Sequence, residues 1–560
     1  MNSVLVALMA LTAYLLAYRF YARFLGRKIF RIDPERATPA HTLRDDIDFV
    51  PTNRYVLFGH HFASIAGAAP IVGPAIAVIY GWLPGLLWVV LGTIFIGGVH
   101  DFSSLVVSLR HQGRSIGDLT EDLIGRRARN LFLILIFFGL SLVLAVFAIV
   151  IGVLFRQHPQ SVFPTFFLII LAMGIGTLVF KTGFGLKGAT VVGVLLMGWG
   201  IAYGASHPMG GGISLNLWIV ILLSYAFVAS VLPVWALLQP RDYLNSFALY
   251  FGLGAMYLGL FLVHPKIVAP AVQLHPVGAP PIFPFLFILI ACGAISGFHS
   301  LVASGTTAKQ IDRETDASFI GYGAMLAEGS LSTMAVLACT AGIGSAALWH
   351  QRYASWGAMN SLSHKLGAFV DGAGGFVSAL GFSPEVSKTL VVVIVVSFAM
   401  TTLDTCARML RFIVSEIGEN AGISVLQNRY PASAAAVLSG LALARIPVGK
   451  VSSGMALWPL FGVTNQIIAA LALLTVSVYL YRKGRPTLYT MLPMVFMLVV
   501  SISGMFLKIS AYWRDRNFLL LGVGSLILLL EVWLVLESWI VFREQRNGRK
   551  GPAAEGTISP

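Results

Sequence analysis

The sequence has 560 residues, of which 57% are hydrophobic and only 11% are charged. A soluble globular chain carries about 25% charged residues, so this one lacks the charge to cover a soluble surface. Long apolar runs recur along its whole length, which predicts an all-α polytopic membrane protein. The net charge of +14 comes from basic residues between these runs. That placement indicates cytoplasmic loops and excludes nucleic acid as the expected partner.

Each apolar run approaches the roughly 20 residues that a bilayer crossing needs. The first run starts at Val4 with no basic segment before it, which indicates a membrane helix and not a cleaved signal. We predict about 15 transmembrane helices. They cover residues 3–20, 57–80, 84–108, 130–155, 164–180, 187–204, 215–238, 246–264, 282–304, 320–345, 388–411, 433–444, 454–481, 487–507 and 518–541.

The basic residues orient these helices. With the N-terminus outside, 28 of the 38 lysines and arginines fall in cytoplasmic segments. This bias predicts an external N-terminus and a cytoplasmic C-terminus in the plasma (inner) membrane. An even number of spans would reverse the position of the N-terminus.

The second apolar run contains GHHFASIAGAAPIVGP, residues 59–74. Gly67, Pro70, Gly73 and Pro74 predict a discontinuous helix, because they interrupt backbone hydrogen bonds that only protein or a polar cavity can replace inside a membrane. A tightly packed kinked helix is the structural alternative. Three polar side chains favour a functional segment: the adjacent pair His60 and His61, and Ser64, which shares a helix face with His60.

Three further segments depart from plain apolar helix. The adjacent pair His100 and Asp101, near the inner half of the third span, is a weaker candidate, and we expect the two side chains to point to different faces. In 224–245, Pro233 follows Ser230 and interrupts a span that ends at Arg241 and Asp242 on the inner face. In 293–307, Ser296, Ser300 and Ser304 form a hydroxyl stripe beside His299, with Thr306 and Thr307 at the inner end. Bonding of each serine to its own helix is the alternative.

The third of these segments, 397–412, places Asp404 four residues before Arg408, below Thr401 and Thr402. Such a pair can neutralise itself near the interface, and a coupling role for Asp404 is the alternative. Glu328 and the run LWPLFGVTNQ, 457–466, are weaker candidates. Cys292, Cys339 and Cys406 lie in apolar segments and predict neither a disulfide framework nor a metal site. We expect no cofactor and no catalytic residue.

The two interrupted spans, 57–80 and 215–238, start five spans apart, so they run in opposite directions. This spacing predicts a five-plus-five inverted repeat with substrate bound near mid-membrane. The expected parts are a first helix and basic loop (1–56), a ten-helix transport core (57–411), peripheral helices (412–542) and a disordered tail (543–560). The core includes an outer connection, 346–387, with an amphipathic pattern.

Six segments together resemble the carbon starvation protein A (CstA) family over about residues 50–480. They are FGHHFASIAGAAPIVGP, LPGLLWVVLGTIFIGGVHDF, VLPVWALLQPRDYLN, GAISGFHSLVASGTT, TTLDTCARMLRFIVSE and LWPLFGVTNQ. The resemblance implies a bacterial or archaeal inner-membrane transporter with a LeuT-like core. Members are associated with peptide uptake during carbon starvation or with uptake of pyruvate together with protons.

The sequence contains no GxxxxGK[ST] phosphate-binding loop, so a secondary active symporter is favoured over an ATP-driven pump. The broken helices are expected to hold a carboxylate through backbone amides. Sodium-coupled symport of peptides or amino acids and a passive channel for small organic acids are the alternatives. The expected partners are the substrate, H⁺ or Na⁺, membrane lipid and, as one option, further copies of the chain.

The predicted roles divide the candidate residues into three sets. Substrate binding is assigned to Gly67, Ala68, Pro70, Gly73, Ser230, Pro233, Ser296 and His299. Ion coupling is assigned to His60, His61, Ser64, Ser300, Ser304, Thr306, Thr307 and Asp404. Gating or structural roles are assigned to His100, Asp101, Arg241, Asp242, Thr401, Thr402 and Arg408.

Overall fold

The computed structural model describes the whole chain except residues 47, 183–184, 234–236, 359–361, 446–452 and 547–560. Most of the predicted tail therefore lies outside the described residues. The described part is built from helices joined by loops, with isolated β-bridges between Asn2 and Lys266 and between Thr52 and Ile311. The prediction of an all-α membrane protein is confirmed.

The helices follow in chain order. They are α1 (Ser3–Leu16, helical onward to Phe30), α2 (Pro39–Thr42), α3 (Arg54–Ile65), α4 (Ala69–Ala77), α5 (Trp82–Gly92), α6 (Gly98–Leu109), α7 (Ile116–Leu123), α8 (Arg126–Gln157), α9 (Val162–Thr182), α10 (Leu186–Ser206), α11 (Leu215–Val231), α12 (Leu238–Val263), α13 (Ile282–Leu289), α14 (Ala291–Ala294), α15 (Gly297–Gly305), α16 (Gly323–Ala341), α17 (Ala346–Arg352), α18 (Leu362–Ser378), α19 (Pro384–Asn420), α20 (Arg429–Ala444), α21 (Ser453–Arg482), α22 (Leu488–Arg514) and α23 (Phe518–Arg546).

Eleven helices within the described ranges are long and apolar enough to cross a membrane, or 12 if the bent pair α3–α4 is one span. Three predicted spans lie outside this set. The segment 215–238 contains the 17-residue α11, 433–444 lies in the 16-residue α20, and 282–304 is divided into three short helices. The count of about 15 therefore stays a prediction.

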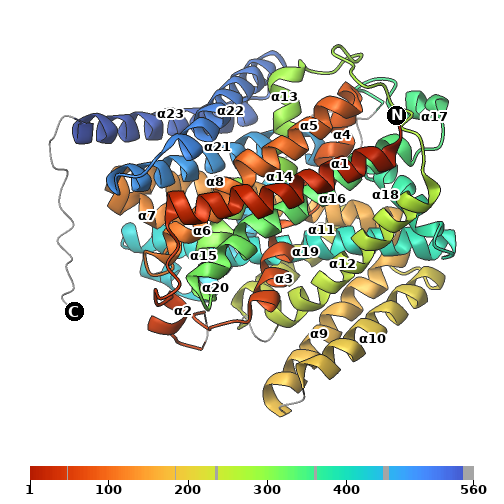
Figure 1. Ribbon diagram of the computed structural model, residues 1–560, viewed down its shortest axis with the longest axis horizontal. Coiled ribbons are helices and arrows are strands. Elements are labelled where there is room, and N and C mark those ends of the chain that lie inside the picture. Colours follow the sequence, from red (N-terminus) through yellow and green to blue (C-terminus); the bar gives the residue numbers. More distant parts are fainter. Residues whose placement is uncertain (47, 183–184, 234–236, 359–361, 446–452, 547–560) are drawn as a thin grey trace.

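The most buried helices occupy the middle of the molecule. The apolar windows of α8, α16, α19 and α21 are 83%, 89%, 94% and 100% buried, whereas those of α10 and α23 are each 33% buried. In Figure 1, α22 and α23 lie along one edge, and α9 and α10 form a separate hairpin at the lower right. The α9–α10 and α22–α23 pairs therefore flank a central bundle.

Two opposite faces can be distinguished by the loops that meet there. The end formed by residues 31–54, 110–125, 306–316 and 482–487 is called the basic face. There Arg110 bonds Glu314 at 2.7 Å, and Arg482 donates to the carbonyl of Asp122 at 2.9 Å. At the opposite face, Tyr80 donates to Pro280 O and Tyr353 donates to Ala75 O. The predicted outer connection, with α17 and α18, covers this opposite face.

Candidate transport site between two broken helices

The first predicted break is confirmed. Helices α3 and α4 form a pair bent by 47°, and the residues between them are 66–68. A Cβ on Gly67 would lie 2.6 Å from the ring of Phe147 and 2.7 Å from Thr402 Oγ1. Pro70 stands in the first turn of α4, where a missing N–H costs no helical bond. The glycine permits close packing at the break, and the proline restarts the helix.

The second break lies elsewhere than predicted. Helix α13 ends at Leu289, and the chain is extended at Ile295 and Ser296 before α15 begins at Gly297. This second broken segment packs against the first: a Cβ on Gly73 would lie 2.2 Å from the carbonyl oxygen of Leu289. Ser296 is therefore outside the helix, and the predicted continuous stripe with Ser300 and Ser304 is wrong.

Pro233 marks the end of a helix and not a break within a span. Helix α11 stops at Val231, and α12 begins at Leu238, before Pro240. The prediction that this span ends at Arg241 and Asp242 is therefore wrong: both residues lie near the start of α12, where a proline is tolerated in the first turn. Ser230 donates to Ser433 of α20 at 2.9 Å, so its hydroxyl serves α11–α20 packing.

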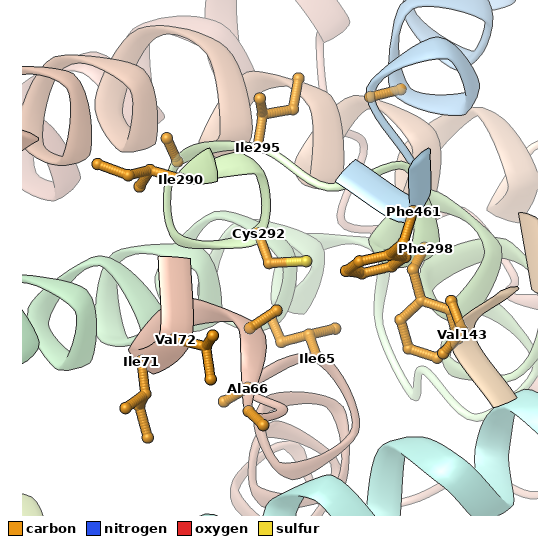
Figure 2. Close-up of a cluster of buried hydrophobic side chains, with 14 of the residues drawn as sticks. Ile65, Ala66, Ile71, Val72, Val143, Ile290, Cys292, Ile295, Phe298 and Phe461 are labelled. Carbon is orange, nitrogen blue, oxygen red and sulfur yellow. The ribbon is translucent and has the colours of Figure 1, made fainter. Parts of the chain in front are cut away.

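Apolar side chains fill the space between the two breaks (Figure 2). In this view Ile65, at the end of α3, and Ala66, in the first break, lie below Cys292, whose thiol points into the cluster. Phe298 and Phe461 lie beside them. These five residues are at most 7% exposed. Side chains of α8 and α21 thus close the region where the two broken helices meet.

A buried ion network lies beside the first break. His60 Nδ1 is 2.8 Å from Asp242 Oδ2, and Arg241 bonds both Asp242, at 3.0 Å, and Asp404. Tyr225 donates to Asp404 Oδ2 at 2.8 Å. The carboxylates are fully buried and Arg241 is 2% exposed, so each charge depends on its partners. We call His60, Asp242, Arg241, Asp404 and Tyr225 the arginine network.

The predicted pairing of Asp404 with Arg408 is wrong. The guanidinium of Arg408 instead donates to the carbonyls of Ala229 and Leu232, and Arg411 donates to Ser230 O at 2.8 Å. These carbonyls belong to the last turn of α11, where unpaired C=O groups and the negative end of the helix dipole attract cations. Asp404 therefore forms its ion pair with Arg241 and not with Arg408.

A second network lies on the other side of the histidine pair. His100 Nδ1 is 2.7 Å from Asp101 Oδ1, which corrects the prediction that these neighbours point apart. Both side chains are long enough to meet across one helical step. His299 Nδ1 is 2.9 Å from Asp101 Oδ2, and its Nε2 is 3.3 Å from Glu328 Oε2. We call His100, Asp101, His299 and Glu328 the acid–histidine network.

The predicted hydroxyl residues have different partners. His61 Nδ1 lies 2.8 Å from Thr307 Oγ1, and Thr402 Oγ1 donates to Ser64 O at 3.2 Å. Asn245 of α12 donates to Thr401 Oγ1 at 3.0 Å. The remaining hydroxyls bond their own helix turns: Ser300 to Gly297 O, Ser304 to Ser300 O and Thr306 to Val302 O.

Asn465 and Gln466 stabilise the second break, a role that the pattern LWPLFGVTNQ does not itself predict. Asn465 Oδ1 accepts from the backbone of Phe298 at 3.0 Å, and its Nδ2 donates to Ser296 at 2.9 Å. Gln466 donates to Phe287 O at 2.6 Å. Amides within an apolar helix were the available signal, since each can satisfy backbone groups freed by a break.

A cavity of about 500 Å³ opens on the basic face between α7, α8, α15 and α19. Its polar lining includes Arg114, Lys309 and Glu416, and Leu140 and Leu301 lie on its apolar wall. A second space of about 20 Å³ shares Gly305, Lys309 and Phe412 with it and is lined by His60. The basic face therefore leads toward the arginine network.

The broken membrane helices, their buried ion networks and the cavity on one face define the class: a multi-pass membrane transporter. The family can then be stated, because the chain belongs to the carbon starvation protein CstA family, whose model matches residues 2–383 and 347–504. The resemblance predicted from the sequence is confirmed.

Two relatives and one structure illustrate the likeness. The Campylobacter jejuni protein named peptide transporter CstA is 34% identical, over 91% of this chain and 81% of its own. The Escherichia coli pyruvate/proton symporter BtsT is 33% identical, over 90% and 81%. A variant of the Eremococcus coleocola manganese transporter shares the fold with a TM-score of 0.54 at 12% identity, over 90% of this chain and 99% of its own. The names of the two relatives confirm a transporter and not an enzyme, and the solved structure shows the fold alone.

Proposed function

We propose that this chain is a proton-coupled symporter that imports a small carboxylate such as pyruvate, or peptides, during carbon starvation. The supporting observation is the pair of buried histidine–carboxylate networks that flank the first break, with His60 and His61 adjacent between them. Histidine gains and loses a proton near neutral pH, and ionisable groups inside membranes commonly form proton relays.

The substrate is proposed to lie between the breaks, where the amino ends of α4 and α15 begin. Gly67, Ala68 and Pro70 precede or open α4, and Ser296 precedes α15. Backbone amides at such broken ends suit an anionic group such as a carboxylate. Opening of the apolar contacts around Phe298 and Phe461 would release it toward the basic face.

The packing supports a five-plus-five inverted repeat with a changed membership. We propose a first repeat of α3–α4, α5–α6, α8, α11 and α12, with the α9–α10 hairpin inserted. The second repeat is α13–α15, α16, α19, α20 and α21. Helices at equivalent positions make equivalent contacts: α3 packs on α12, and α15 packs on α21. The equivalent helices α8 and α19 pack on each other, and so do α11 and α20. The core would thus extend beyond the predicted 57–411.

Counting α11, α13–α15 and α20 as crossings gives the predicted 15 spans. The segments 57–80 and 282–304 are then seven spans apart, an odd number, so the two broken helices run in opposite directions as an inverted repeat requires. The same count keeps the N-terminus outside and the basic face cytoplasmic, in the plasma or inner membrane.

Sodium coupling is the second candidate, on a specific observation. At the end of α3, beside the first break, the hydroxyl of Ser64 has no hydrogen-bond partner among the described residues. Thr402 Oγ1 donates to the Ser64 carbonyl at 3.2 Å. Hydroxyl and carbonyl oxygens are suitable ligands for a hard cation. A sodium ion held there would couple transport without histidine titration.

Uptake into proteoliposomes tests the proposal. Labelled pyruvate and a labelled dipeptide are offered under an imposed pH gradient, a sodium gradient or neither. Proton coupling predicts accumulation with the pH gradient alone, and His61→Ala should abolish it because the bond to Thr307 and the titratable ring are lost. The exposed His207→Ala is the matched control and should transport normally. Accumulation driven by sodium alone would contradict the proton proposal, and purely downhill movement would indicate a channel.

A further inference from the structure

Glu328, halfway along the membrane span Glu314–Ala341 that contains α16, is a buried acid with few groups that could stabilise a negative charge. It is 0% exposed, and neither carboxylate oxygen has a hydrogen-bond partner among the described residues. The ionic neighbour that the structure gives it is His299 Nε2, at 3.3 Å. An ionised carboxylate removed from water without hydrogen bonds is strongly disfavoured, whereas a protonated one is tolerated.

His299 makes the two carboxylates of the acid–histidine network depend on each other. Its two ring nitrogens face Asp101, at 2.9 Å, and Glu328, at 3.3 Å. A neutral imidazole has one N–H and one acceptor nitrogen. His299 can therefore satisfy both acids only when it is an imidazolium, or when one acid carries the proton itself. Asp101 already accepts from His100 at 2.7 Å, which leaves Glu328 as the acid that can take the proton.

Binding of this proton to Glu328 changes the net charge of the acid–histidine network. With His100 neutral, Asp101 and Glu328 ionised and His299 an imidazolium, the acid–histidine network has one net negative charge; protonation of Glu328 cancels it. Titratable groups reach it from several helices. They are His299 from α15, Asp101 from α6 and Cys292 from α14, with His61 of α3 near Asp101 and His299, and Tyr14 of α1 beside Thr333.

The acid–histidine network also joins three helices of the fold. His299 lies in the first turn of α15, directly after the second break, whereas Asp101 and Glu328 belong to α6 and α16. Helix α14 packs so tightly on α16 that a Cβ on Gly293 would lie 2.3 Å from Ser332 Oγ. A change of charge at Glu328 therefore alters the electrostatic attraction between α16 and His299 on α15.

We propose that Glu328 is the proton-binding residue that couples transport, with His299 as the positioning residue between it and Asp101. The proposal rests on the proton-coupled function above. A proton from the external solution binds the Glu328 carboxylate as substrate binds. It leaves to the cytoplasm after α15 has separated from α16, and the carboxylate is restored.

The test is Glu328→Gln in the same proteoliposomes. Glutamine keeps the shape of the protonated acid but cannot release a proton. Accumulation driven by the pH gradient should fall to the level reached without a gradient, for pyruvate and dipeptide alike. Counterflow, in which internal unlabelled solute exchanges with external labelled solute, should persist because it needs no proton release. Glu531→Gln is the matched control: Glu531 is also 0% exposed, and its hydrogen bond among the described residues is to Ser501, between the peripheral α22 and α23.

Each outcome decides the matter. Normal gradient-driven accumulation by Glu328→Gln, with wild-type accumulation intact, overturns the role of Glu328 and leaves the proposed function standing. If wild type itself fails to accumulate either solute under a pH gradient, the proposed function fails and this role falls with it. If Glu328→Gln also loses counterflow, Glu328→Asp decides: restored pH-driven accumulation supports a titrating carboxylate, and its absence overturns the proposal.

Discussion

Arg241 holds two aspartates at once within the membrane-spanning core. It contacts Asp242 and Asp404, both 0% exposed, and donates to Tyr225 at 2.6 Å. His60 reaches the same network through Asp242. A guanidinium suits this position because it stays charged and presents several N–H groups in a fixed plane. Removal of Arg241 would leave two carboxylates near each other with no fixed cation.

Arg241→Gln is therefore expected to destabilise the protein by about 3–5 kcal/mol, the usual cost of breaking a buried ion pair by deleting one partner. Arg241→Gln combined with Asp404→Asn should lose less than the sum of the two single losses, because the second change removes the stranded carboxylate. Thermal unfolding in detergent measures each variant. The exposed Arg127→Gln should stay within about 0.5 kcal/mol of wild type. Strictly additive losses would contradict the network.

At the scale of elements, the local sequence predicts the first break better than the second. Prolines as well as glycines mark the first, and the bent pair α3–α4 lies where predicted. The second has no proline between Leu289 and Gly297, and its extended residue Ser296 bonds Asn465, which lies 169 positions away in the sequence. Local sequence could not reveal a break that depends on a distant amide.

The same limit applies to the candidate site. His60, His61, His299 and Asp101 were recognised individually, because ionisable residues in membrane helices are costly and therefore informative. Their partners were not, since pairing across helices depends on packing that sequence distance does not encode. Arg408 illustrates this: the nearest acid along its own helix was Asp404, yet the end of α11 is what it bonds.

Gly73 tests the contact between the broken helices. Gly73→Ala would place a Cβ 2.2 Å from Leu289 O, a backbone atom that cannot turn away, so α4 and α13 must separate. We expect a loss of about 1–3 kcal/mol in stability and a matching loss of uptake. Gly198→Ala in α10 is the control, because a Cβ added there would have no atom within 4 Å and alanine favours helix. Equal behaviour of the two variants would refute the close contact.

At the scale of the whole molecule, the two faces differ in chemistry. Loops on the basic face carry ion pairs such as Arg110 with Glu314 and Arg36 with Glu314, and the cavity of about 500 Å³ opens there. The opposite face is covered by α17, α18 and the loop 264–281. If the basic face is cytoplasmic, the cavity is an exit for imported substrate. His60, which lines the adjoining space of about 20 Å³, then lies on the route by which a proton would leave.

Labelling of introduced cysteines tests this orientation. Cys292, Cys339 and Cys406 are buried, so the native chain offers a low background. Val277→Cys lies in the loop 264–281 at a position 68% exposed, and Arg313→Cys lies on the basic face, where the native side chain is 74% exposed. An impermeant maleimide should label Val277→Cys in intact cells and Arg313→Cys only after the membrane is opened, because basic loops are retained in the cytoplasm. Labelling of Arg313→Cys from outside would make the cavity an external one, and the direction assigned to substrate and proton would reverse.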